Sequence, residues 1–149
     1  MVSGLAEDSP PQPVERPRRK QIKQEVIAAI QAEAELMHSF IARTRILFGS
    51  LDANRHDFTR MAIGLLLGMA DDLESDLIMR SGTRPLRYLT GLDRSAKLCL
   101  LSIGSLIEAL NSGAPELPQA DAQPLLLALS DGKTILERIR QRIEPYVTM

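Results

Sequence analysis

Apolar residues recur every three or four positions between Asp93 and Asn111. Such a period is that of one face of an α-helix. The stripe consists of Ala96, Cys99, Leu100, Ile103, Leu106, Ile107 and Leu110. Three other segments show a similar period, and none can bury its apolar stripe alone. We therefore expect four helices that share one core.

The first two helices are predicted from their apolar period and from the residues at their ends. One helix is expected over residues 18–48, ended by Gly49. The next is expected after a cap at Asp52 or Asn54, and it should stop near Gly82. The middle of this second helix, AIGLLLGMA, is apolar on all sides. A helix of that kind is covered on more than one side, by its own bundle or by a second protein surface.

The start of the third helix is predicted from a capping pattern. Residues 83–89 indicate a turn or a short helical piece, with Pro85 suited to a first-turn position. Thr90 is followed three residues later by Asp93, which matches a capping box. The third helix is therefore expected to begin near Gly91.

The fourth helix should use Asp121 as its cap and tolerate Pro124 in its first turn. Its apolar positions alternate steps of four and three, as in a coiled-coil seam, with a gap at Gly132. These positions are Leu125, Leu129, Leu136, Ile139, Ile143 and Tyr146. Four amphipathic helices with short connections predict an all-α protein, an up-and-down four-helix bundle over residues 18–149.

Residues 1–17 are expected to lie outside this fold. Four prolines fall within them, and the segment shows no apolar period. Proline cannot continue a helix and favours extended conformations in its predecessor. We therefore expect a disordered, proline-rich N-terminal arm followed by a single helical domain.

Composition narrows the class of protein. A chain of 149 residues can bury roughly 70% of the surface of its unfolded state, enough for a core without disulfides or metals. Aromatic residues make up only 3% of the chain, so aliphatic side chains and Met must fill that core. The single Cys99 lies on an apolar stripe, which indicates a small buried hydrophobe in a reducing compartment.

The sequence also bears on localisation. No apolar run has the eighteen or more residues of a membrane span, and the longest, 61–70, has ten and is closed by Asp71 and Asp72. The first residues carry acids where a secretory signal needs bases. We therefore expect no membrane insertion and a cytoplasmic protein.

The most enzyme-like string is Asp71-Asp72-Leu73-Glu74-Ser75-Asp76. Asp72 and Asp76 lie four residues apart on a helix, so they could share a Mg²⁺ ion bound to a diphosphate. Over these six residues the string resembles the aspartate-rich motif of prenyl-diphosphate synthases, which implies such a magnesium-dependent activity. Those enzymes carry a second motif of this kind, which this chain lacks.

The two histidines give little support for a metal site. Neither His38 nor His56 is spaced three or four residues from the other or from Cys99. Glu35 and His38 form a single Glu-x-x-His pair, whereas di-iron bundles need two. No phosphate loop or nucleophile elbow is present either, so we expect no cofactor, no metal and no catalytic residues.

A basic run at the end of the arm could contact nucleic-acid phosphates. The residues are Arg16, Arg18, Arg19, Lys20 and Lys23. No aromatic residue is interleaved to stack on bases, so a solubilising tail explains the run as well. A nucleic-acid-associated bundle is therefore an alternative hypothesis.

The leading hypothesis is a small non-enzymatic interaction module, an adaptor or regulator that forms a homo-oligomer or binds a protein partner. It depends on the second helix, where Leu67 is expected to lie away from the core beside the small residues Gly64 and Gly68. Together with Ile63, these residues are predicted to form a second contact surface.

Overall fold

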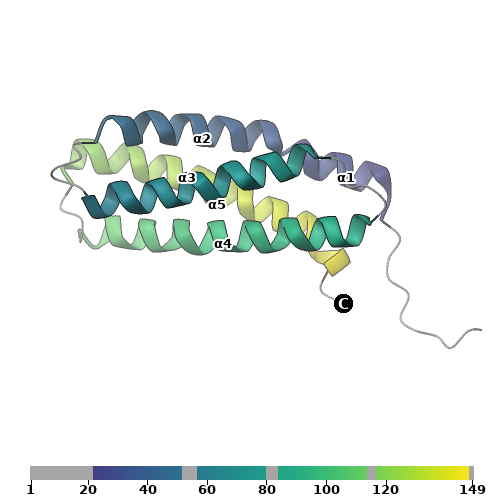
Figure 1. Cartoon of the computed structure of the whole chain (residues 1–149). Helices are drawn as coiled ribbons and strands as arrows, with labels where there is room; N and C mark the ends of the chain where they lie inside the picture. Colours follow the sequence, from purple (N-terminus) through teal and green to yellow (C-terminus); the bar gives the residue numbers. More distant parts are fainter. Residues whose placement is uncertain (1–21, 52–56, 80–83, 114–116, 148–149) are drawn as a thin grey trace, which may run out of the picture.

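A computed structural model of the chain describes residues 22–51, 57–79, 84–113 and 117–147. These ranges contain five α-helices and no strand (Figure 1), which confirms the all-α class. The helices are α1 (Gln24–Gln31), α2 (Ala34–Gly49), α3 (Asp57–Ile78), α4 (Pro85–Asn111) and α5 (Gln119–Val147). The predicted disorder of residues 1–17 concerns residues outside the described ranges.

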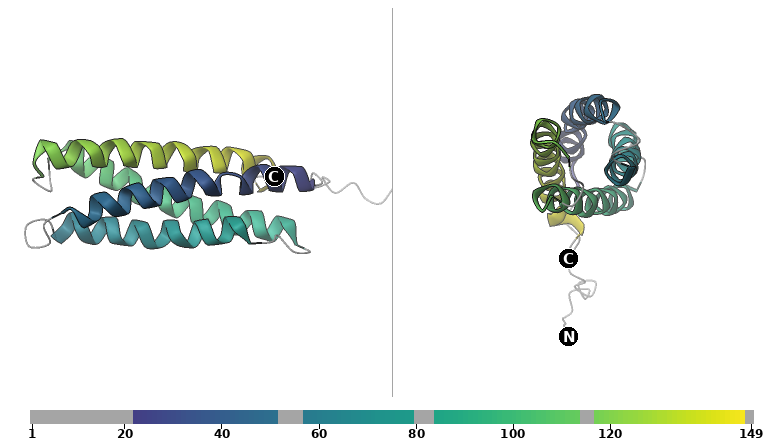
Figure 2. Two further views of the ribbon diagram at one scale, coloured as in Figure 1. Left: turned by 90° about the horizontal axis from the view of Figure 1, so that it is seen from above. Right: turned by 90° about the vertical axis from the view of Figure 1, so that its left-hand side faces the viewer.

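The four long helices surround one core. Each of them packs against two others, in the cyclic order α2, α3, α4, α5, and successive helices run in opposite directions (Figures 1 and 2). The short α1 packs on α5 and α3 at one end. Every long helix therefore turns one stripe inward and leaves an outer stripe uncovered by the other helices.

The predicted seam of the last helix is confirmed. Its inward positions, from Leu125 to Ile143, are fully or almost fully buried, and they include Leu129, Gly132, Leu136 and Ile139. The ring of Phe40 of α2 occupies the gap at Gly132. A Cβ at position 132 would overlap this ring. Phe40 itself is only 3% exposed. The missing side chain on α5 thus makes room for the largest side chain of the α2–α5 contact.

The prediction of one continuous first helix is wrong. A break after Gln31 separates α1 from α2, and the described chain becomes helical only at Gln24. The amide of Glu33 donates to the carbonyl of Ile30 at 3.1 Å, the i to i−3 bond of a tight turn. The turn places the Glu33 carboxylate between two bases of α5. Arg138 Nε donates to both carboxylate oxygens at 3.0 Å, and Arg142 Nε donates at 3.1 Å.

The predicted start of the third helix is also wrong. The helix begins at Pro85 rather than near Gly91, although Pro85 does occupy the first turn. Leu89 and Leu92 extend the buried stripe toward the N-terminus, and this packing stabilises the extra turns. The capping pattern is therefore inside the helix, and the Thr90 hydroxyl donates back to its own helix.

Side chains from neighbouring helices satisfy backbone carbonyls at two helix ends. Arg60 of α3 donates to the carbonyls of Phe48 and Leu51 at 3.1 and 2.9 Å. The Tyr88 hydroxyl of α4 lies 2.8 Å from the carbonyl oxygen of Asp76, to which it donates, and 3.0 Å from that of Leu77. These bonds set the position of α3 along the axis of α2, and that of α4 along the axis of α3.

Candidate interaction surface

The structure divides the four residues of the predicted contact surface. Ile63 is fully buried and Leu67 is 4% exposed, whereas Gly64 and Gly68 lie on the surface. The expectation that Leu67 faces away from the core is wrong. Leu67 lies one helical turn from Asp71, whose carboxylate accepts a hydrogen bond from α2 at 2.6 Å. Its side chain is therefore covered by α2 within the same chain.

Three exposed apolar residues in the N-terminal half of α3 lie along a different line, whereas Ile78, which is also exposed, lies on another side at the C-terminal end of the helix. Phe58, Met61 and Leu65 are each about two thirds exposed, at 67, 66 and 65%. They are spaced by three and four residues, so they share one face. Glu74, which hydrogen-bonds His38 of α2 at 2.9 Å, lies nine residues from Leu65, or roughly 180° around the helix. The exposed stripe is therefore on the side of α3 away from α2 and next to α4.

A second group, of two exposed apolar residues, lies on α4. Leu98 is 52% and Leu101 65% exposed. Asp93 marks the α5 side of this helix, because it accepts a hydrogen bond from Arg140 at 3.0 Å. Leu98 lies about 140° around the helix from Asp93, on the side of α3. We define the α3–α4 face as Phe58, Met61, Leu65, Leu98 and Leu101.

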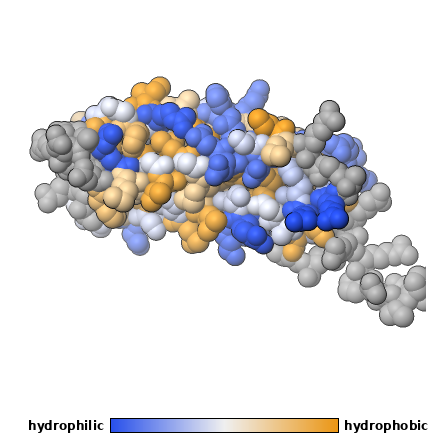
Figure 3. Space-filling view, viewed as in Figure 1, coloured by the Kyte–Doolittle hydropathy of each residue, from blue (hydrophilic) through white to orange (hydrophobic). Residues whose placement is uncertain are grey.

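In Figure 3, viewed from the side of α3, hydrophobic residues reach the surface among hydrophilic ones over α3 and α4. Phe58, Met61 and Leu65 share the helical period of the apolar residues of α3, yet they lie outside its buried line. The buried line of α3 consists of Ile63, Leu66, Ala70, Leu73 and Leu77. A helical stripe centred on these five buried residues does not include Phe58, Met61 or Leu65.

Charged side chains continue the α3–α4 face toward the C-terminal end of α3. Asp72 of α3 and Arg94 of α4 are both exposed. Within the described ranges neither forms a hydrogen bond or ion pair. Asp72 lies about 120° around α3 from the buried Leu66, and Arg94 about 140° around α4 from the buried Cys99. Both therefore point outward, away from the core.

The acidic string of α3 is spread around the helix. Asp71 pairs with Arg45 and Glu74 with His38, both on the α2 side. Asp72 lies on the opposite side, toward α4. In the part of the chain that the structure describes, no group of three or more His, Cys, Asp or Glu side chains could hold a metal ion.

The basic residues proposed for nucleic-acid contact fall almost entirely outside the described ranges. Arg16, Arg18, Arg19 and Lys20 are not described. Lys23 is described, and it is exposed immediately before α1. The nucleic-acid hypothesis therefore stays a prediction.

Cys99 is fully buried on the inward stripe of α4, as its position in the sequence predicted. Burial, with a smaller contribution from the negative charge of Asp72, raises the pKa of the thiol from its ordinary 9.0 to about 11. The thiolate is the reactive form, and at pH 8 its population in the folded protein is lowered by roughly a hundredfold.

We therefore expect Cys99 to react with a disulfide reagent at pH 8 at least about 100 times more slowly in the native protein than in urea.

The raised pKa of the Cys99 thiol also links its ionisation to folding. The stabilisation is fully present below about pH 9 and is lost as the pH rises toward 11. Urea titrations of wild type and Cys99→Ala from pH 8 to 11 measure this contribution as the difference between the two proteins, because the raised pKa of Tyr88 affects both. Rapid reaction of Cys99 with the disulfide reagent in the native protein at pH 8 would contradict the slow reaction expected above.

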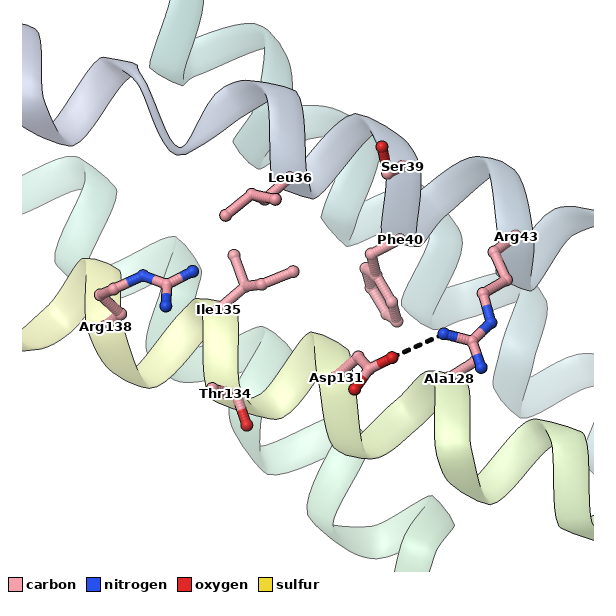
Figure 4. A pocket seen from close by; sticks show the side chains of 9 residues that line it. All are labelled: Leu36, Ser39, Phe40, Arg43, Ala128, Asp131, Thr134, Ile135 and Arg138. Atoms are coloured by element: carbon pink, nitrogen blue, oxygen red, sulfur yellow. Dashed lines mark hydrogen bonds and ion pairs between the residues drawn. The ribbon is translucent and has the colours of Figure 1, made fainter.

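A pocket of about 320 Å³ lies between α2 and α5 (Figure 4). Leu36 and Ile135 point toward each other across it. Arg43 and Asp131 form an ion pair of 2.6 Å at one end, and Arg138 lies at the other end, where it binds Glu33. Both guanidinium groups are already paired, so an anionic ligand would have to displace an existing acid. The pocket offers mainly apolar contact.

No protein-family model matches the sequence, and comparisons with curated proteins and with solved structures give no match. None of the described helices has the length and apolar character needed to cross a lipid bilayer.

Proposed function

We propose that this chain is a small non-enzymatic interaction module, an up-and-down four-helix bundle that binds a protein surface through the α3–α4 face. The supporting observation is that five large apolar side chains on two adjacent helices are each more than half exposed. Single exposed apolar residues are common, but a group of them on neighbouring helices is typical of an interaction site. Covering such a group with a partner removes apolar area from water.

The magnesium-dependent enzyme hypothesis gains no such support. Asp72 and Asp76, the two carboxylates proposed to share the ion, lie on one side of α3. Asp71 and Glu74 are paired with Arg45 and His38 on the α2 side, and among the described residues no group of three or more His, Cys, Asp or Glu side chains could hold a metal ion. Carboxylates that share a metal ion must converge on one point, at oxygen distances of about 2.0–2.1 Å for Mg²⁺. The interaction hypothesis needs no rearrangement of these side chains.

The proposal is tested by placing a photo-crosslinking amino acid at Leu65 in cells that naturally express the chain. A matched control carries the same amino acid at Gln141, an exposed position of α5. We expect a discrete protein adduct from position 65 that is missing from position 141. Identical adduct patterns from the two positions would overturn the proposal.

A further inference from the structure

The α3–α4 face has a defined register between its two helices. The Tyr88 hydroxyl lies within 3.0 Å of the carbonyl oxygens of Asp76 and Leu77, so these positions are level. The helices run antiparallel, and each residue advances about 1.5 Å. Counting back along α3 and forward along α4 places Asp72 within about half a turn of the level of Arg94.

The same count places Leu65 level with the segment between Leu98 and Leu101. The face is therefore divided along its length into an apolar part and a charged part. In the charged part the acid is on α3 and the base on α4. Each is exposed and unpaired within the described ranges, and each points outward rather than at the other.

A two-fold axis parallel to the bundle makes this face complementary to itself. Such an axis lays α3 of one copy over α4 of a second copy at the same level. Leu65 then meets Leu98 and Leu101 of the second copy, and Asp72 meets Arg94 of the second copy. Because the contact is isologous, every pairing occurs twice.

We infer that the α3–α4 face binds a second copy of this chain, with Leu65 at the centre and two Asp72–Arg94 ion pairs between the copies. The inference rests on the proposed function and names its partner. Over residues 58–72 the face is roughly 22 Å long and about 20 Å wide, which corresponds to on the order of 1,000 Å² of buried surface for both copies. This area is at the small end of specific interfaces, so the dimer is reversible.

Charge exchange between copies tests the inference. Asp72→Arg places two arginines at each contact, and Arg94→Asp places two aspartates there, so each variant alone repels itself. An equimolar mixture restores an opposite pair at both contacts, and only between different chains. Asp72 and Arg94 are exposed, so both variants should fold like the wild type, which circular dichroism checks.

Sedimentation of the wild type at protein concentrations from about 1 to 500 µM should show a dimer whose population rises with concentration. We expect each charge variant to dissociate at least tenfold more readily, and the mixture to recover the wild-type dimer. Glu137→Arg, an exposed change on α5, should have no effect. Leu65→Glu should give a folded monomer.

A wild type that stays monomeric overturns the inference, and so does a mixture that stays monomeric or single variants that dimerise normally. Failure of this inference can be distinguished from failure of the proposed function. If position 65 crosslinks to a different protein while the wild type is monomeric, the second copy is excluded and the interaction module stands.

Discussion

Replacing Arg138 and Arg142 together by methionine is expected to lower the free energy of unfolding by about 3–5 kcal/mol. The Glu33 side chain is 7% exposed, and its carboxylate receives all of its described hydrogen bonds from these two guanidinium groups. Without them a buried charge has no partner, and the desolvation of that charge is no longer offset.

Two further variants separate this mechanism from a general loss of packing. Glu33→Gln leaves two arginines whose side chains are 38 and 44% exposed, so water can solvate them, and we expect a smaller loss of about 1–2 kcal/mol. The triple variant, with Gln at 33 and Met at 138 and 142, should be more stable than the double variant. Urea unfolding followed by circular dichroism gives the three values. A triple variant no more stable than the double would contradict the mechanism.

This ion-pair cluster also explains why the first helix could not be predicted correctly. Residues 30–34 contain no glycine or proline, so the local sequence gives no sign of a break. The bases that bind Glu33 lie 105 and 109 residues further along the chain. A turn stabilised by partners so distant is visible only once the helices are packed. The α5 seam, in contrast, follows from local period alone, and it was predicted correctly.

The exposed face of α3 was missed for a different reason. Between Met61 and Ala70 the helix is apolar on nearly all sides, so its period does not determine which line faces the core. The position of α2 decides it, through the contacts of Asp71 and Glu74 with α2. Two of the four residues predicted to form an interaction surface on this helix, Ile63 and Leu67, are therefore buried by the bundle.

The fit of Phe40 against Gly132 leads to the second large expected effect. Phe40→Ala should lower the free energy of unfolding by about 3–5 kcal/mol, because it leaves a cavity between α2 and α5. Gly132→Ala should destabilise by a net of about 1–2 kcal/mol. The added methyl group overlaps the Phe40 ring, and this overpacking outweighs the gain of up to about 1 kcal/mol from replacing a helical glycine.

The sign of the Gly132→Ala effect should reverse once Phe40 is absent. In the Phe40→Ala background the methyl group enters free space, so the same substitution should stabilise by about 0.5–1 kcal/mol. Gly104→Ala is the matched control, because Gly104 lies within α4 and a Cβ there meets nothing within 4 Å. It should stabilise the wild type by a similar amount. Should Gly132→Ala stabilise the wild type as much as Gly104→Ala does, the ring would be free to move aside, and Gly132 would not be needed for the contact between α2 and α5.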